Sequence, residues 1–296
     1  MLLHGYLPYF ILISAQFLAL SQSIPSNMSQ LIFQLFSFGH PPDSHAFIEA
    51  LKTLPAGDKP LWVGRVRHWF AEPSYTKDQL MKNWDYLVIE RQKLPDQLTS
   101  SANASLTITS NSAGEMPDIS VIKEQLLAKP TPALPSGWSL DDHSGLDAAI
   151  PHDGVKYSLD STSRVLGSES ASDRITWKEF IVRLSKAYSG PISVLNILPY
   201  QPGQREAFLE GYVGGFNAIM GPNYGGGALC FGTDVALSSH EGEDEDFKWD
   251  DISLVWYPSI WHFGKMFDDP EYARLDREFK PALRDNPLLC CTEIEI

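Results

Sequence analysis

Apolar and polar positions alternate most regularly near the end of the chain. Residues 251–257 place three apolar side chains on one side of an extended segment, which predicts a strand. Pro258 is expected to end this strand and to lead into a short helix over residues 260–267. Asp269 is placed to cap a second helix, and alternation returns over residues 288–296. The segment is therefore predicted to run strand, helix, strand.

The residues before this segment show the beginning of the same unit. A helix over residues 175–188 leads into an apolar strand over residues 191–198. The helical spacing of residues 204–220 ends at Gly221, and residues 228–232 again have the pattern of a strand. Joined to the closing segment, these elements follow the β-α-β-β-α-β order of a ferredoxin-like unit.

An earlier and less regular copy of this unit is predicted in the first half of the chain. Its elements are strands over residues 31–38, 61–69 and 84–90, a helix that begins at Pro41 and ends by Gly57, a helix over residues 119–128 and a closing strand over residues 138–140. Leu61–Gly64 resembles Leu229–Gly232, and Trp84–Asp85 resembles Trp249–Asp250. Both matches recur roughly 165 residues later and in the same order, which favours an internal duplication.

The chain is accordingly divided into four segments. They are a leader over residues 1–27, a divergent first unit over residues 28–140, an irregular linker over residues 141–174 and a second unit over residues 175–296. The linker is predicted from its richness in Ser, Pro, Asp and Gly, a composition that builds little packed core.

Composition narrows the range of partners. The chain has 296 residues, 43% of them hydrophobic, and a formal net charge of −14. No basic cluster offsets this acidic excess, which argues against nucleic acid or an anionic membrane surface as a partner. The acidic run over residues 241–246 matches no calcium-loop spacing and is interpreted as a solvated loop. Three cysteines imply no disulfide framework, and Cys230 is interpreted as a small buried apolar residue.

The first residues allow two interpretations. Residues 6–20 form an apolar run, too short for a comfortable membrane span, and the small residues Ser21 and Ser23 follow it as in a secretory signal. Met28, just before the first predicted strand, is the alternative start. The first interpretation predicts a secreted protein from which residues 1–23 are cleaved, and the second predicts a cytoplasmic protein.

Several segments of the second copy form a pattern found in a known family. The segments are Pro191–Asn196, Gly227–Gly232, Trp249–Ser259, Phe263, Asp269–Tyr272 and Arg284–Asp285. They resemble the DUF1330 family, a functionally uncharacterised branch of the dimeric α/β barrel superfamily. Small members of that superfamily pair their sheets across a two-fold axis. The resemblance therefore implies an α+β fold in which two ferredoxin-like units close one barrel internally, as a pseudo-dimer within a monomer.

Asn196 is the first candidate for a site residue. It lies on the same face of an apolar strand as Val194 and Leu198, where an amide needs hydrogen-bond partners. The resemblance adds that some monooxygenases of the superfamily use a first-strand Asn in substrate or oxygen chemistry. An amide satisfied by neighbouring backbone is the alternative.

Three further side chains are candidates for catalysis. His68 is expected on the same face as Trp62, Val66 and Phe70, either as a general base or as a hydrogen-bonded structural histidine. Tyr257 and His262 flank a predicted turn and either supply a phenol and an imidazole to one pocket mouth or pack at an edge.

A cluster of glycines lies inside the predicted helix of the second unit. Gly211, Gly214 and Gly215 each cost up to about 1 kcal/mol relative to Ala in a helix. Two reasons are open, close approach of the helix to the sheet and room for a ligand between them.

Two functional hypotheses follow. In the first, a cofactor-independent isomerase, lyase or monooxygenase acts on a small apolar molecule in a pocket of the second unit, without a bound metal. In the second, the same pocket only binds such a molecule, or the fold is an interaction module. Polar groups that converge on a cavity of several hundred cubic ångströms, on the scale of ordinary ligand pockets, favour an enzyme or carrier, whereas a filled interior favours the module.

Overall fold

The computed structural model describes residues 29–39, 41–112, 118–133, 156–168, 170, 172–238 and 247–296. The predictions for the leader, for a strand over residues 138–140 and for the acidic run over residues 241–246 lie outside these residues. Within the described residues, no helix combines the length and the apolar character that crossing a membrane requires.

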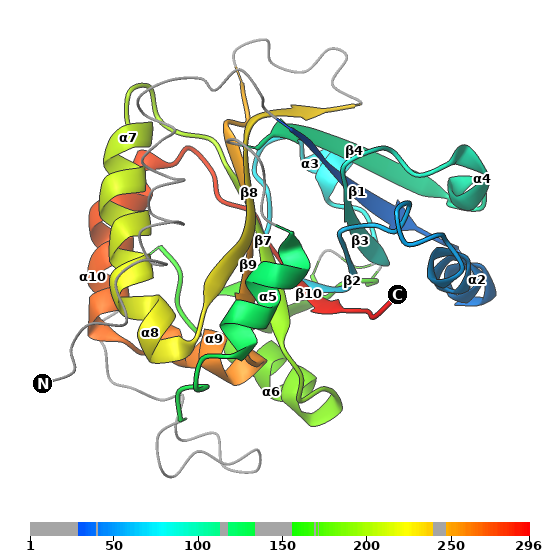
Figure 1. Cartoon of the computed structure of the whole chain (residues 1–296). Coiled ribbons are helices and arrows are strands. Elements are labelled where there is room, and N and C mark those ends of the chain that lie inside the picture. Colours follow the sequence, from blue (N-terminus) through cyan, green and yellow to red (C-terminus); the bar gives the residue numbers. More distant parts are fainter. Residues whose placement is uncertain are drawn as a thin grey trace, which may run out of the picture.

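Eight antiparallel strands form a closed barrel (Figure 1). The strands are β1 (Gln30–Ser37), β2 (Trp62–Ala71), β3 (Tyr86–Glu90), β4 (Ala104–Asn111), β7 (Ile192–Leu198), β8 (Gly227–Leu237), β9 (Asp251–Tyr257) and β10 (Leu288–Glu293). Their order around the barrel is β1-β3-β2-β10-β7-β9-β8-β4, and every neighbouring pair is antiparallel. The predicted α+β class with a barrel-like core is confirmed.

The barrel consists of two runs of four strands with the same internal order. The first run is β4-β1-β3-β2, and the second run is β10-β7-β9-β8. When the four strands of a run are counted along the chain, strand one pairs with strands three and four. Strand three also pairs with strand two. The pairs β2–β10 and β4–β8 join the two runs and close the barrel.

The fourth strand of the first run is not where the sequence predicted it. β4 follows β3 after only a short helix, α4 (Asp96–Thr99), whereas the predicted closing strand lay over residues 138–140. The predicted helix is present as α5 (Ile119–Leu127), but it comes after β4. Ser and Thr dominate β4 and conceal its two-residue period, in which Leu106 and Ile108 face the barrel interior.

Side chains fill the interior of the barrel. The residues that fill it come from both runs and are each at most 3% exposed: Phe33, Leu35, Trp62, Trp69, Leu87, Ile89, Leu195, Ile197, Leu254, Trp256 and Leu289. Helix α5 adds Ile119, Ile122 and Leu126 to the same cluster. The interior is therefore a packed core, as in other small barrels.

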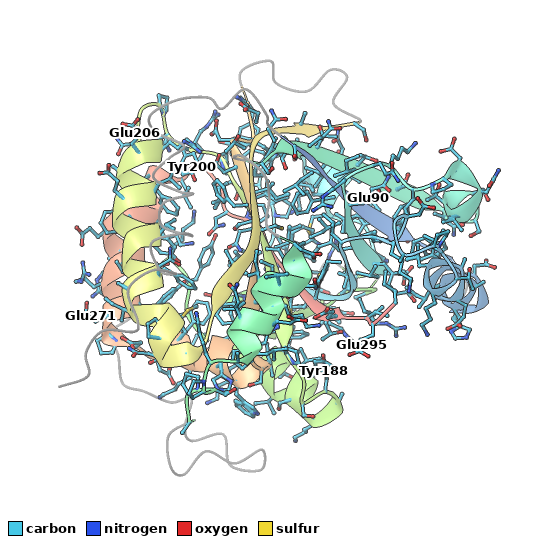
Figure 2. The ribbon with its side chains drawn as sticks, in the orientation of Figure 1. Glu90, Tyr188, Tyr200, Glu206, Glu271 and Glu295 are labelled. Carbon is cyan, nitrogen blue, oxygen red and sulfur yellow. The ribbon has the colours of Figure 1, made fainter. Side chains whose placement is uncertain are left out.

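Helices cover the outer face of each run. On the first run, α2 (Pro41–Lys52) packs Phe47, Ile48 and Leu51 against the strands. The second run is covered by α6 (Trp177–Ala187), α9 (Ile260–Met266), α10 (Pro270–Phe279), the turn η4 (Lys280–Ala282) and a long helix of four consecutive segments, α7 (Arg205–Phe208), η2 (Leu209–Val213), η3 (Phe216–Met220) and α8 (Gly221–Tyr224). Figure 1 shows α2 and α7 at opposite ends of the molecule. The exposed Glu206 and Glu271 mark the outer side of the helical layer (Figure 2).

Two connections differ from the sequence prediction. The long helix does not end at Gly221 but continues through α8 to Gly225, whose φ of 70° belongs to the left-handed region that glycine adopts without strain. The predicted irregular linker contains the strand β5 (Thr162–Arg164), which pairs with β6 (Arg174–Thr176), where the sequence predicted the start of a helix. A further short helix, α3 (Lys77–Leu80), precedes β3.

Candidate functional site

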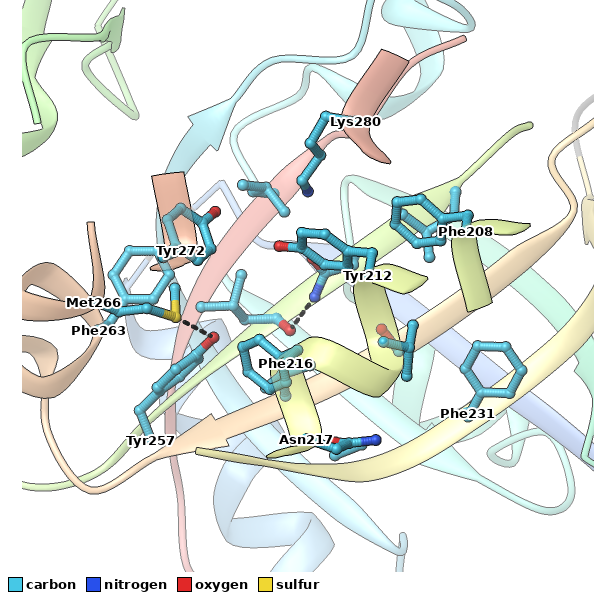
Figure 3. A pocket seen from close by; sticks show the side chains of 18 of the residues that line it. Phe208, Tyr212, Phe216, Asn217, Phe231, Tyr257, Phe263, Met266, Tyr272 and Lys280 are labelled. Atoms are coloured by element: carbon cyan, nitrogen blue, oxygen red, sulfur yellow. Dashed lines mark hydrogen bonds between the residues drawn. The ribbon is translucent and has the colours of Figure 1, made fainter. Parts of the chain in front are cut away.

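A cavity of about 80 Å³ lies between the outer face of the second run and its helices (Figure 3). β7 contributes Val194, Asn196 and Leu198, while the intervening Leu195 and Ile197 face the barrel interior. The period of the strand thus directs one set of side chains into the core and the other set into the cavity. Aromatic rings make up much of the remaining wall: Phe208, Tyr212, Phe216, Phe231, Tyr257, Phe263, Phe267 and Tyr272.

Asn196 is a half-buried residue of the cavity wall. Its Nδ2 donates a hydrogen bond to the Val194 carbonyl oxygen at 3.0 Å, which is the backbone partner expected of a structural amide. No donor to its Oδ1 is found in the described part of the chain. Ser253, which faces Asn196 on β9, also lines the cavity. An amide acceptor and a hydroxyl group therefore lie side by side on the sheet.

Tyr257, the last residue of β9, also lines the cavity, as the sequence hypothesis required of a site residue. Its ring packs edge-on against Phe263, and its hydroxyl group points to the Met266 sulfur at 3.9 Å. Burial raises the pKa of Tyr257 well above the ordinary value of a phenol, so the group stays protonated. It is available as a hydrogen-bond donor and not as a base.

The long helix faces the cavity through its two π-helical segments. Tyr212 and Val213 come from η2, and Phe216 and Asn217 come from η3. A π-helical turn widens the helix locally, and such turns occur frequently at functional sites. The position of these segments over the cavity is consistent with that tendency.

The glycines of the long helix serve a contact that the sequence did not predict. A side chain at Gly211 would collide with the ring of Phe279, and one at Gly215 would collide with Leu275, both on α10. These two glycines allow close approach of two helices, not of helix and sheet. Gly214 is exposed and faces open space.

Lys280 is a wall residue that the sequence analysis missed. It is 3% exposed, its Nζ donates to Asn286 Oδ1 at 2.5 Å, and the same Nζ lies 4.6 Å from the centroid of the Tyr212 ring. Burial lowers the pKa of Lys280 to about 8. The negative charge of Asp276 acts to raise this pKa, and the positive charge of Lys156 lowers it further. The sequence carries one signal for this residue: a spacing of four residues places Lys280 on the same helical face as Tyr272 and Asp276.

Two tyrosines complete the polar side of the cavity. The hydroxyl group of Tyr272 donates to that of Tyr212, and burial raises the pKa of both phenols. Both therefore stay neutral in the physiological range. With Tyr257 and Lys280 they form one polar part of the wall, and Asn196, Ser253 and Asn217 are the other polar residues that line the cavity.

His68 lies beside Phe70, as predicted, but on the opposite side of its strand from Trp62 and Val66. The pairing of β10 with β2 contains two register shifts, so Trp62 and Val66 face the interior while His68 faces outward. Its Nε2 lies 2.7 Å from Ser163 Oγ, and its ring stacks on Phe180 at a centroid distance of 4.2 Å. Burial lowers the pKa of His68 to about 4.

His262 is likewise absent from the cavity wall. Its Nε2 lies 3.0 Å from the Pro132 carbonyl oxygen, and its Nδ1 lies 2.8 Å from Ser259 Oγ. A carbonyl oxygen only accepts, so the proton is on Nε2 and the Ser259 hydroxyl donates to Nδ1. The structure thus brings Asn196 and Tyr257 to one cavity and holds both histidines elsewhere.

A buried ion pair fastens the long helix to the start of β9. Asp251 is 1% exposed and accepts from Arg205 Nε at 2.9 Å and from the Tyr200 hydroxyl at 2.9 Å. Burial raises the pKa of Asp251 to about 6, against the opposing effect of Arg205. The adjacent Asp250 points away and accepts from the Tyr200 backbone N–H, as strand alternation requires. Over the described ranges, no group of three or more His, Cys, Asp or Glu is arranged to hold a metal ion.

Comparison with known proteins leaves the family open. No protein-family model matches the chain, so none supports the resemblance to DUF1330, and no curated protein matches its sequence. The RPA0582 protein of unknown function from Rhodopseudomonas palustris is 21% identical over 39% of this chain and 93% of its own, with a TM-score of 0.32. An anthrone oxidase-like protein is 9% identical over 91% of this chain and 93% of its own, with a TM-score of 0.40. Because both TM-scores lie below 0.5, neither similarity assigns a fold or an activity.

Proposed function

We propose that this chain binds a small, largely apolar molecule in the cavity of the second unit and acts on it as a cofactor-independent enzyme of the isomerase, lyase or monooxygenase type. The observation that carries the proposal is the convergence of polar groups from separate elements on one apolar cavity. Asn196 belongs to β7, Tyr257 to β9 and Tyr212 to η2. Convergent polar groups in an apolar pocket are the usual mark of a ligand site.

The chemistry of these groups suits a substrate that carries an oxygen atom. The neutral phenol of Tyr257 can donate to an oxygen on which negative charge develops, and this is the main way in which such sites lower a barrier. The free Oδ1 of Asn196 can accept from a hydroxyl group or a C–H acid. The cavity of about 80 Å³ is roughly half the size of one that holds benzene, at ~150 Å³, and so restricts the molecule to a few non-hydrogen atoms.

The proposal includes an architecture. The two runs are ferredoxin-like units, over residues 28–140 and 175–296, joined by a linker over residues 141–174 and related by internal duplication. Their identical strand order supports this origin, since 4-1-3-2 is the order of a ferredoxin-like sheet. On this proposal the chain is a monomer that closes its own dimeric α/β barrel.

The proposal is tested by binding and turnover together. Native mass spectrometry of protein from its natural source is expected to show a retained small molecule, which is then supplied as substrate. The variants Asn196→Ala and Tyr257→Phe are expected to lose at least about tenfold in affinity or rate, a factor that corresponds to one hydrogen bond. Tyr188→Phe removes a phenol that is not among the cavity-lining residues and serves as the matched control. Unchanged binding and turnover in both cavity variants would contradict the proposal.

The alternative is a non-catalytic binding or interaction module. The filled barrel interior favours it, and so does a cavity of about 80 Å³, which is smaller than the several hundred cubic ångströms expected of an enzyme or carrier. On this alternative the retained molecule binds and leaves unchanged. Product formation that depends on Tyr257 distinguishes the enzyme from the module.

A further inference from the structure

Lys280 is unusual because it is a buried cation without a carboxylate in direct contact. In the described residues no carboxylate oxygen lies within 4.0 Å of its Nζ, and Asn286 Oδ1 is the acceptor found there. The rings of Tyr212 and Tyr157 lie at 4.6 and 5.6 Å from Nζ. A buried ammonium group with so little compensation is costly, which favours the uncharged amine.

The same side chain reaches the cavity. Lys280 is among the residues that line it, and Figure 3 shows the Nζ end directed toward the side chains of Tyr212 and Tyr272. The uncharged form of this amine, at a cavity wall with neutral phenols beside it, has the arrangement of a nucleophile with adjacent proton donors.

A proton acceptor lies behind the lysine. Asp276 is fully buried, and its Oδ2 accepts from the Lys156 backbone N–H at 2.6 Å. Its Oδ1 is buried and has no hydrogen-bond partner among the described residues, and the same holds for Asn286 Nδ2. These unpartnered atoms belong to residues that surround Lys280 and indicate a polar site that is completed by a further group.

We infer that Lys280 forms an imine with a small aldehyde or ketone bound in the cavity. The inference deepens the proposed function, on which it rests, by naming the substrate class and the nucleophile. The lowered pKa of about 8 supports it, since roughly a tenth of the lysine is then uncharged at pH 7, against fewer than about one in a thousand for an ordinary lysine.

The reaction balances without an oxidant or a reductant. The Lys280 amine attacks the carbonyl carbon, a C–N bond forms, and the carbonyl oxygen takes a proton from the Tyr212–Tyr272 pair, which regains one from the nitrogen. Asp276 takes the proton that the Lys280 ammonium group loses before the attack and returns it to the hydroxyl group of this carbinolamine. The C–O bond then breaks, water leaves, and the nitrogen lone pair forms the C=N bond. One ammonium group and one carbonyl compound give one protonated imine and one water.

The test traps the imine with sodium cyanoborohydride on the full chain, with propanal and acetone as separate probes at pH 7. Peptide mapping by mass spectrometry then compares Lys280 with the exposed lysines Lys82 and Lys186. We expect at least about tenfold more reduced adduct on Lys280 in spite of its burial, because of its larger uncharged fraction. Adduct in proportion to exposure would overturn the inference.

Two variants connect the adduct to the cavity. Ala228→Leu fills part of the cavity and is expected to lower the adduct on Lys280 at least about fivefold and to leave Lys82 and Lys186 unchanged. Lys280→Met removes the amine and is expected to abolish adduct in this region, whereas the control Lys82→Met, which removes an exposed lysine, retains it. If Lys280→Met fails to fold, the ratio measured on the wild-type chain still decides.

The outcome also separates the inference from the proposed function. A ligand that binds the cavity and depends on Asn196 and Tyr257, without adduct on Lys280, refutes imine formation alone. Failure of both ligand binding and adduct formation refutes both.

Discussion

The two runs of strands carry an amide at the same position and surround it differently. Gln34 of β1 faces Val88 of β3, and Asn196 of β7 faces Ser253 of β9. Gln34 is 1% exposed, and its Nε2 donates to Thr107 Oγ1 at 3.1 Å. Asn196 instead borders a cavity. The same place in the strand order therefore holds a packed amide in the first run and an accessible one in the second.

The helices account for this difference. In the first run α2 packs Phe47, Ile48 and Leu51 into a cluster with Phe36 and Tyr86, and all five side chains are buried. The long helix of the second run leans through its glycines on α10 and passes over the sheet in two π-helical segments. Strand order thus sets where a site is possible, and helix packing decides whether the space is filled.

Tyr86 of the first run and Asp251 of the second occupy the same position in their runs. The largest expected loss of stability comes from removing Arg205, the ion-pair partner of Asp251. Tyr86 faces Phe36, and Asp251 faces Leu198. Arg205→Met leaves Asp251 as a buried charge without its partner and is expected to lower the free energy of unfolding by about 3–5 kcal/mol in urea at pH 7.5.

Two controls accompany this measurement. The double variant Arg205→Met with Asp251→Asn is expected to recover most of the loss, because the buried charge is gone. Tyr86→Phe, whose hydroxyl contacts are both 3.4 Å long, is expected to cost less than about 1 kcal/mol. A loss below about 1 kcal/mol for Arg205→Met would show that the ion pair does not fasten the helix.

A difference in stability cost between two leucine-to-alanine variants, one in each run, tests whether the two runs are packed differently. Leu51→Ala empties a fully buried site on the inner face of α2 and is expected to cost about 4 kcal/mol. Leu198→Ala enlarges the existing cavity, where the leucine already lacks some of its contacts, and is expected to cost about 2 kcal/mol. Both are measured by urea unfolding, and equal costs would contradict the difference in packing between the two runs.

The smallest effect concerns His68, on β2 of the first run. Its folded-state pKa of about 4 lies below the ordinary 6.5, so the unfolded chain binds more protons between these values and stability falls as pH drops through that window. Between pH 7 and pH 5 the wild type is expected to lose about 2 kcal/mol more than His68→Gln. Titration of Asp251 and Glu90 is common to both proteins and cancels in the difference. Parallel pH profiles would show that His68 titrates normally.

Much of the fold was predictable because local patterns sufficed. The alternation of residues 251–257, the cap at Asp269 and the paired matches around Trp84 and Trp249 all have counterparts in the structure. β4 was missed because only Leu106 and Ile108 show its period among Ser and Thr. His68 was placed on the wrong face because a register shift arises from pairing with β10, which is distant in the sequence.

The sequence by itself determined the α+β class, most of the barrel strands and two cavity residues, Asn196 and Tyr257, since each follows from periods of two or about four residues. Only the tertiary structure decided that the barrel is filled, that the cavity lies under the long helix, and that Lys280 is buried beside Tyr212. Burial, desolvation and the space left between helix and sheet depend on residues distant in the chain, and no local pattern records them.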